Sequence, residues 1–235
     1  TRLSPWGLRL PADSRVDDHP AFADGLVEVQ DEGSQLIALA GEARDGERIL
    51  DLCAGGGGKA LARAAAAPGA QILATDTNRS LLSKLPPRAA KAGATIETRL
   101  LDMPRELEGL ADWADSADLV LVDAPCSGSG TWRRNPEGRW RLSPERLERV
   151  IRLQAHLLDI AAAMVRPGGR LVYAVCSILN REGEAQAAGL LSRHSSWVAQ
   201  ETPVQAGRST SAGRLLVPGQ DGTDGFFVAR LARPC

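Results

Sequence analysis

The 235-residue sequence has little lysine and almost no net charge. Three of its 28 basic residues are lysines, and the formal net charge at pH 7 is −1. A charge this close to zero gives no overall field that would draw the protein to nucleic acid or to a membrane surface. Binding to either must therefore come from a local patch of charge.

Close-spaced cysteine pairs are also missing. The four cysteines lie far apart in the sequence, at Cys53, Cys126, Cys176 and Cys235. Zinc sites and disulfide frameworks need short, characteristic spacings, so neither is expected and no metal is predicted. The sequence has no apolar run long enough to span a bilayer and no signal-peptide pattern at its start. We expect a cytoplasmic protein in a reducing compartment, without membrane attachment.

The length fits one sizeable core, so we expect a single domain, acting as a monomer. Residues 1–24 are rich in Pro, Asp and Arg without a hydrophobic period, and we interpret them as an N-terminal arm. Because the first residue is Thr rather than Met, the chain is interpreted as a fragment or a processed form, and the arm as the remnant of an upstream region. Residues 25–235 are predicted to form the domain itself.

Short apolar runs, partly β-branched, predict an α/β fold with buried parallel strands over residues 48–53, 71–76, 95–101, 118–122 and 170–175. Further strands are expected over residues 25–34, 197–200, 214–217 and 225–231. Helices are expected over residues 35–43, 60–67, 77–91, 144–165 and 180–192. Ser34 is predicted to cap the first helix, and Pro86-Pro87 to kink or divide the third.

Carboxylates follow the strands at what we expect to be one edge of the sheet. Asp51 lies at the end of the first strand, and Asp76, Asp102 and Asp123 end the next three. Ligands bind at this edge of open α/β sheets, so these side chains predict a polar rim for an adenosine-like ligand. The alternative is that they only cap the helices that follow.

A glycine-rich loop, Ala54 to Lys59, joins the first strand to its helix. A strand, a glycine loop and a helix in this order let backbone amides approach a ligand at the helix N-terminus. Two thiols also follow buried strands, Cys126 after residues 118–122 and Cys176 after Val175. Adjacent strands would bring these thiols together, although the usual state of a cysteine is buried and inert.

Residues 133–152 hold seven arginines against three glutamates. Arginine and aromatic side chains beside a catalytic loop suit single-stranded nucleic acid, through phosphate pairing and base stacking. We assign RNA contact to Arg133, Arg134 and Trp140. The arginines from Arg146 onward are interpreted as a solvated helix face with Glu and Arg pairs.

Several blocks, in this order, resemble the signature of RNA 5-methylcytosine methyltransferases of the Sun/RsmB type. The matching blocks are residues 51–59, 123–131 with 133–136, and 173–178 followed by Glu182 and Glu184, with flanking blocks at 29–35 and 224–227. The resemblance covers the chain from about residue 25 onward. It implies a Rossmann-like class I methyltransferase domain with a doubly wound, mostly parallel, seven-stranded sheet whose last strand is antiparallel.

The resemblance also implies that S-adenosylmethionine is the cofactor. Asp76 would lie at its ribose, Asp102 near its adenine, and Asp123 close to both the cofactor and the target base. In that family the cysteine matching Cys176 is the nucleophile, and the one matching Cys126 assists product release. The implied loop contacts come from Cys53, Ala54, Gly55, Gly56, Gly57, Gly58 and Lys59.

The implied reaction methylates carbon 5 of a cytosine in RNA, with ribosomal RNA as the preferred substrate and tRNA as the alternative. Carbon 5 is a poor nucleophile, so the Cys176 thiolate must first add to carbon 6. Its pKa must lie below the ordinary value of about 8.5, and Lys59 and the cofactor's sulfonium are the expected causes. Asp123 stabilises charge in the adduct, and Cys126 promotes elimination. The cytosine is expected in a single strand or flipped out.

The cofactor loop departs from the family pattern. The family usually has Ala-Pro where this sequence has Gly55-Gly56, and Thr where it has Ala60. Because Gly-Gly is more flexible than Ala-Pro, cofactor affinity is the property most affected. A cofactor-binding RNA-binding protein without activity is therefore an alternative.

Two other enzyme classes share parts of this pattern. A nicotinamide-dependent oxidoreductase would have the strand, glycine loop and acid, but it would not explain two thiols at the sheet edge. A cysteine hydrolase would need a histidine partner for its thiol. The three histidines are expected in the arm and in helices, away from the thiol loops: His19, His156 and His194.

Overall fold

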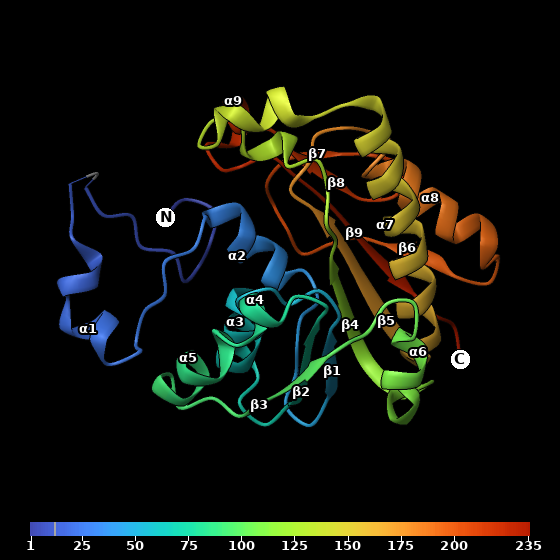
Figure 1. The fold of residues 1–235 in the computed structure, drawn as a ribbon, viewed down its shortest axis with the longest axis horizontal. Helices are drawn as coiled ribbons and strands as arrows, with labels where there is room; N and C mark the ends of the chain where they lie inside the picture. The colour runs from blue at the N-terminus through green and yellow to red at the C-terminus, as the bar shows by residue number, and fades with distance from the viewer. Residues whose placement is uncertain (12) are drawn as a thin grey trace.

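One mixed sheet forms the centre of the protein in the computed structural model, which describes residues 1–11 and 13–235 (Figure 1). Within these residues the sheet has nine strands, and the first five are parallel, in the order β3-β2-β1-β4-β5. Beyond β5, β9 pairs antiparallel with β5, β6 and β8, and β8 pairs antiparallel with β7. The strands are β1 (Arg48–Asp51), β2 (Gln71–Asp76), β3 (Ile96–Leu100), β4 (Ala117–Asp123), β5 (Val165–Val175), β6 (Val198–Gln200), β7 (Arg208–Ser209), β8 (Arg214–Leu216) and β9 (Phe226–Ala232).

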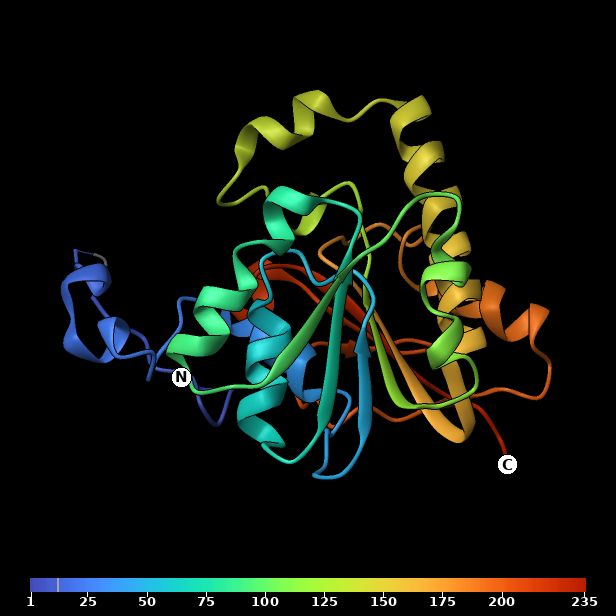
Figure 2. The same cartoon turned by 60° about the horizontal axis from the view of Figure 1, so that its bottom comes forward.

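Helices cover both faces of the sheet. Figures 1 and 2 show α2 to α5 on one side and α6 to α8 on the other, which confirms the predicted doubly wound, mostly parallel α/β fold. The helices are α1 (Pro20–Ala23), α2 (Glu32–Leu39), α3 (Gly58–Ala66), α4 (Arg79–Leu82), α5 (Leu85–Lys91), α6 (Glu106–Gly109), α7 (Pro144–Met164), α8 (Glu184–Arg193) and α9 (Pro218–Asp221). Short 3-10 turns are η1 (Val16–Asp18), η2 (Ala111–Trp113), η3 (Ser129–Thr131) and η4 (Pro136–Arg141). None of the helices in the described ranges is both long and apolar enough to cross a membrane.

Side chains of the central strands alternate between two layers of core. In β4, Leu119 and Leu121 pack in the layer that contains α2, whereas Val120 and Val122 pack in the layer that contains α7. All four side chains are fully buried. A strand buried on both faces needs apolar residues at every position, which explains the continuous apolar run in its sequence.

The sheet has more strands than the seven that the resemblance implied. Short strands β7 and β8 form an antiparallel pair on the outer side of β9. Only Arg208 and Ser209 make up β7, so no alternation of apolar and polar residues could mark it in the sequence.

The prediction of a strand over residues 25–34 is wrong. Within the described chain these residues form no strand, and α2 already begins at Glu32. The Asp31 carboxylate caps α2 by accepting a hydrogen bond from the Gly33 N–H at 2.9 Å, so Ser34 is not the cap. A capping carboxylate satisfies an amide that the helix leaves free, and this local contact outweighs the alternating pattern.

The helix predicted over residues 77–91 is divided in two, as its Pro-Pro pair indicated. α4 ends at Leu82 and α5 begins at Leu85, with proline in its first turn. Proline fits there because the first turn needs no N–H from it. Asn78 caps α4 by accepting a hydrogen bond from the Leu81 N–H at 3.1 Å, so Asp76 is not the helix cap.

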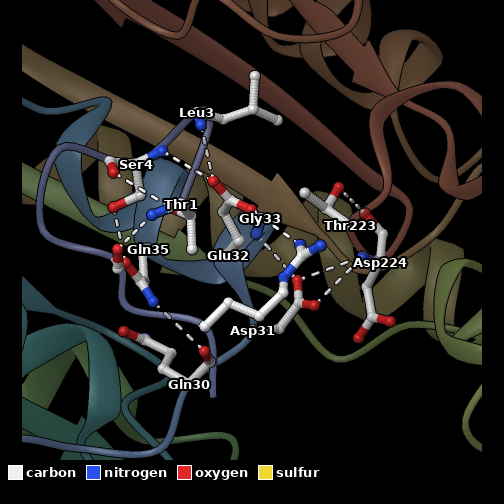
Figure 3. A network of polar contacts seen from close by, with 12 residues as sticks. Thr1, Leu3, Ser4, Gln30, Asp31, Glu32, Gly33, Gln35, Thr223 and Asp224 are labelled. Atoms are coloured by element: carbon white, nitrogen blue, oxygen red, sulfur yellow. Dashed lines mark hydrogen bonds and ion pairs between the residues drawn. The ribbon is translucent and has the colours of Figure 1, made fainter. Parts of the chain in front are cut away.

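The N-terminal segment packs against α2 through one buried carboxylate, Glu32 (Figure 3). The backbone N–H groups of Leu3 and Ser4 donate hydrogen bonds to Glu32 Oε1 at 2.7 and 3.0 Å. The Ser4 hydroxyl donates to Gln35 Oε1 at 2.6 Å. The start of the chain is thus fixed to α2, while a boundary between residues 24 and 25 stays a prediction.

Trp113 in η2 is 1% exposed and lies in the core layer shared with α7. Replacing a buried aromatic side chain with alanine leaves a cavity, so we expect Trp113→Ala to lower the free energy of unfolding by about 3 to 5 kcal/mol. The matched control is Trp140→Ala, because Trp140 is 78% exposed and its loss should change stability by less than about 0.5 kcal/mol. Urea unfolding followed by circular dichroism measures both values, and equal stability of the two variants would contradict this assignment of the core.

Candidate active site

A cavity of about 410 Å3 opens at the carboxyl edge of the parallel strands. Strands β1, β4 and β5 end at this edge and α3 begins there, because parallel strands place the residues that follow them on the same side of a sheet. Residues that line the cavity include Asp51, Cys53, Lys59, Asp123, Arg134 and Cys176.

The structure brings two thiols from distant parts of the sequence into contact. The Sγ atoms of Cys126 and Cys176 are 3.3 Å apart. The pKa of the Cys176 thiol lies below its usual value because Cys126 donates a hydrogen bond to this sulfur; burial and the Asp123 carboxylate oppose the shift, and Lys59 supports it. The same contact, together with burial, raises the pKa of Cys126 well above its usual value. Cys176 is therefore the more acidic thiol of the pair, with Cys126 as its hydrogen-bond donor.

Lys59 and Asp123 form an ion pair across the cavity. Lys59 Nζ, from the first turn of α3, lies 2.6 Å from Asp123 Oδ2 at the end of β4. Their side chains are 12% and 27% exposed, so both groups can still contact a ligand. A lysine in this position places positive charge near Cys176 and neutralises a carboxylate that would otherwise repel a thiolate.

The conformation of the glycine loop is fixed by the left-handed backbone of Gly57 and by hydrogen bonds to Asp76 and Arg88. Gly57 has a φ of +85°, and a Cβ atom there would lie 2.3 Å from a Leu85 side-chain carbon, so only glycine fits. The Gly55 N–H donates to Asp76 Oδ2 at 2.8 Å. The Arg88 guanidinium donates to the Gly56 carbonyl. Asp76 thus lies against the loop that precedes α3.

Asp51, predicted from the sequence only as part of the polar rim for an adenosine-like ligand, is a buried residue of the site. It lines the cavity, is 1% exposed, and neither of its carboxylate oxygens has a hydrogen-bond partner in the described chain. Its partner is the buried Arg63 guanidinium at 3.6 Å. Burial raises the pKa of Asp51 to about 6, and the Arg63 charge opposes that rise. Its position at the end of the first strand was the signal that placed it in the predicted rim.

Asp224, which was not assigned to the site from the sequence, binds both of the arginines predicted to contact RNA. Its carboxylate is 1% exposed and accepts a hydrogen bond from Arg134 Nε at 2.9 Å and from Arg133 Nη2 at 3.4 Å. Its backbone N–H donates to Asp31 Oδ1 at 3.2 Å (Figure 3). Asp31 and Asp224 both line the cavity. Their place in the flanking signature blocks was the available signal for them.

The other predicted site residues differ in whether they line the cavity. Besides Asp51, the predicted site residues that line the cavity are Cys53, Ala54, Gly58, Lys59, Asp123, Arg134 and Cys176. The lining does not include Gly55, Gly56, Gly57, Asp76 or Arg133. Cys126 contacts the cavity through Cys176. Asp102 is exposed beyond the end of β3 and is not among the lining residues. Trp140 is exposed in η4, where the Arg139 guanidinium lies 4.7 Å from its ring centre.

In the part of the chain that the structure describes, the cavity has neither a metal-binding group nor a histidine beside the thiols. Among the described residues there is no group of His, Cys, Asp and Glu that could hold a metal ion. Nor does any histidine of these residues line the cavity. His156 pairs with Glu106 and His194 with Asp159, and both partners lie outside the lining. The arrangement lacks the acid–base partner of a cysteine hydrolase.

Comparison with known proteins identifies relatives along nearly the whole chain. Ribosomal RNA small subunit methyltransferase B of Salmonella arizonae is 36% identical over 233 residues, which are 97% of this chain and 52% of that protein. The protein of the same name from Xanthomonas campestris pv. campestris is 35% identical over 228 residues, covering 96% of this chain and 52% of that protein. The chain thus spans about half the length of the curated relatives it matches.

Solved structures agree with this relationship. The crystal structure of NSun6 from Pyrococcus horikoshii with SFG superposes with a TM-score of 0.83 at 25% identity, over 95% of this chain and 56% of that chain. A precorrin-6y C5,15-methyltransferase from Geobacter metallireducens, at 14% identity and a TM-score of 0.55, covers 87% of this chain and 88% of that chain and shares the fold alone. The fold is that of class I methyltransferases, and the family model for 16S rRNA methyltransferase RsmB/F matches residues 38–232. The chain belongs to the RsmB/F methyltransferase family.

Proposed function

We propose that this chain transfers a methyl group from S-adenosylmethionine to carbon 5 of a cytosine in RNA, through a covalent adduct with Cys176. Ribosomal RNA is the substrate that the relatives' name suggests, and tRNA is the alternative. The observation that carries the proposal is the 3.3 Å contact between Cys176 and Cys126 at a cavity shared with a glycine loop.

The residues present fit S-adenosylmethionine. The cofactor carries a positive ammonium group, and Asp51 offers a buried carboxylate whose oxygens lack hydrogen-bond partners in the described chain. The loop of residues 53–59 supplies backbone amides at the start of α3, and Asp76 is assigned to the ribose. Asp102 remains assigned to the adenine, although it lies outside the cavity lining. When bound, the cofactor supplies an electrophilic methyl group.

Cys176 acts as the nucleophile. Its thiolate adds to carbon 6 of the cytosine, which forms a carbon–sulfur bond and moves the electron pair of the carbon 5–carbon 6 double bond toward carbon 5. Carbon 5 then becomes nucleophilic enough to accept the methyl group. The hydrogen bond from Cys126 stabilises the thiolate before the attack.

Asp123 and Lys59 are assigned to stabilise the charge that develops in the adduct. Asp123 lies at the end of β4 beside Cys176 and is assigned to the amide-like edge of the cytosine. Its ion pair with Lys59 at 2.6 Å holds the carboxylate in place and offsets its charge. A pre-formed pair of this kind costs no reorganisation when the adduct forms.

Cys126 completes the reaction. After methyl transfer, carbon 5 carries both a proton and the new methyl group. Removal of that proton returns its electron pair to the ring double bond and expels the Cys176 thiolate. Cys126 lies next to Cys176 and is assigned to promote this step. Its thiol is protonated in the free protein, so it must first release that proton to solvent before it acts as the base, directly or through a water molecule.

RNA contact is assigned to Arg133, Arg134 and Trp140. Arg134 lines the cavity, and its ion pair with the buried Asp224 fixes the guanidinium at the entrance. Trp140 presents a 78% exposed ring on which an unpaired base can stack. The site therefore suits a cytosine that is single-stranded or flipped out.

An RNA-binding protein that holds the cofactor without activity is the second candidate, because Gly55-Gly56 departs from the family loop. Gly55 adopts a φ of +55° with open space around it, a conformation that alanine seldom adopts. Isothermal titration with S-adenosylmethionine and a methyl-transfer assay together distinguish the two candidates. Binding without transfer by the wild-type protein would favour the inactive one.

Removing each thiol should have a different effect on methyl transfer to total RNA from a strain lacking the corresponding gene. Cys176→Ala should abolish transfer of label from S-adenosylmethionine and leave cofactor binding intact. Cys126→Ala should accumulate a covalent protein–RNA adduct, seen on denaturing gels, because release is blocked. Cys235→Ala, which changes an exposed thiol away from the cavity, is the matched control and should keep wild-type turnover.

A different result would contradict the role assigned to each thiol. Turnover by Cys176→Ala near the wild-type rate would exclude a nucleophilic role for this residue. Absence of any adduct with Cys126→Ala, in a preparation that still binds cofactor and RNA, would exclude the release role.

Cofactor affinity should rise with pH through the pKa of Asp51. Burial holds that pKa at about 6, so Asp51 is mostly neutral at lower pH and carries the charge that attracts the cofactor's ammonium at higher pH. Between about pH 5 and pH 7.5 we expect the affinity to increase about tenfold, the equivalent of one pKa unit. Titration calorimetry with wild type and Asp51→Asn measures this, and the variant should show weaker, pH-independent binding. A wild-type affinity that is constant or falls over this range would contradict the role of Asp51.

RNA affinity should depend on Arg133 and Trp140. Arg133→Ala should weaken binding and lower the slope of log affinity against log salt by about 0.7, the value for one phosphate contact to a single strand. Trp140→Ala should weaken binding by about 1 to 3 kcal/mol with little change in slope. Arg146→Ala, an exposed change in the first turn of α7, is the control. Filter-binding curves that are equal for all three variants would assign these side chains to a solvated surface.

A further inference from the structure

Glu182 is a buried carboxylate beside the two thiols that the proposed mechanism does not use. It is 0% exposed and accepts four hydrogen bonds. Its Oε1 accepts from the Ser127 N–H at 2.7 Å and from Gln154 Nε2 at 3.2 Å. Its Oε2 accepts from the hydroxyls of Ser127 at 2.5 Å and Ser177 at 2.6 Å.

Three of these four donors come from the loops that carry Cys126 and Cys176, and the fourth, Gln154, comes from α7. Ser127 follows Cys126 in the loop after β4, and Ser177 follows Cys176 at the end of β5. One carboxylate therefore connects the residues next to each sulfur, although the two loops lie far apart in the sequence. A rigid link between two loops is what a 3.3 Å sulfur–sulfur contact requires.

The backbone of Glu182 is also held in place, by two hydrogen bonds. The Tyr173 hydroxyl, inside β5, donates to the Glu182 carbonyl at 2.5 Å, and the Glu182 N–H donates to the Leu179 carbonyl at 3.0 Å. No lysine, arginine or histidine of the described chain pairs with the carboxylate within 4 Å. A buried charge without a cation must be satisfied by neutral donors, and the four hydrogen bonds supply them.

We propose that Glu182 is a positioning residue that sets the contact between Cys126 and Cys176, so that the Cys126 thiol donates its hydrogen to the Cys176 sulfur. The catalytic meaning of this inference rests on the proposed function. The contact itself exists in the free protein and can be measured there.

The contact controls the protonation of Cys176. Hydrogen bonds from thiols are weak and are lost when the two sulfurs separate. The other charged groups near Cys176 are Lys59, Asp123 and Arg134, and they would remain if Cys126 moved away. Since the Cys126 hydrogen bond is the largest cause of the low Cys176 pKa, its loss should raise that pKa. The Glu182 charge also contributes to keeping Cys126 protonated.

The test is the pH dependence of Cys176 alkylation by iodoacetamide, with the modified peptide quantified by mass spectrometry. Glu182→Ala should move the midpoint upward by about one pH unit and reduce the rate near neutral pH about tenfold. Glu182→Gln should keep a rate within about threefold of wild type, because its amide oxygen still accepts hydrogen bonds and the serine hydroxyls can accept from its nitrogen. Glu184→Gln, an acidic residue that binds Ser211 instead, is the control and should leave the profile unchanged.

Each result decides the proposal. An unchanged midpoint in folded Glu182→Ala overturns it. A shift in Glu182→Gln as large as in Glu182→Ala also overturns it, since charge rather than position would then be responsible. If Glu182→Ala does not fold, Ser177→Ala removes one donor and leaves the carboxylate, and a midpoint equal to wild type would reject the link to Cys176. The assay contains neither RNA nor cofactor, so inactivity of the wild type in methyl transfer would refute the proposed function and leave this test intact.

Discussion

The parallel pairing of β4 with β5 is the constraint on which the rest of the site depends. Val122 lies opposite Tyr173, and Asp123 lies opposite Ala174. This register ends the two strands side by side, so the loops that follow bring together sulfurs 50 residues apart in the sequence. Because both faces of these strands are buried, a shift of one residue would move each side chain into the opposite core layer and disrupt the packing of both layers. The packing therefore fixes the site geometry.

Three buried carboxylates around this edge have three different kinds of partner. Asp51 faces the buried guanidinium of Arg63, Asp224 binds arginines that reach the surface, and Glu182 is held by neutral donors. Burying a charge destabilises a protein unless its partners restore what water supplied. These buried carboxylates lower the stability of the fold, and the apolar core layers on the two faces of the sheet offset that cost.

Much of the fold could be predicted because the central strands are buried on both faces, and such burial gives each strand a continuous apolar run in the sequence. Carboxylates and thiols directly after those strands were predictable for the same reason, and the sheet edge collects them. What could not be predicted depends on contacts between distant residues. The cap at Asp31, the partners of Glu182 and the pairing of Arg134 with Asp224 join segments whose proximity no local pattern records. Asp102 was expected to end its strand like the others, but β3 ends two residues earlier, at Leu100, and is the outermost of the parallel strands, so Asp102 is exposed.

The close approach of Gly130 and Gly225 has a consequence for the order in which the site is assembled during synthesis. The Gly225 N–H donates to the Gly130 carbonyl at 2.9 Å, and neighbouring Asp224 holds Arg134. A ribosome adds residues 224 and 225 long after the segment from Cys126 to Arg134 has left its tunnel. That segment therefore reaches its final shape only after Asp224 and Gly225 have been added, and a nascent chain has β4 and β5 before Arg134 has its carboxylate partner.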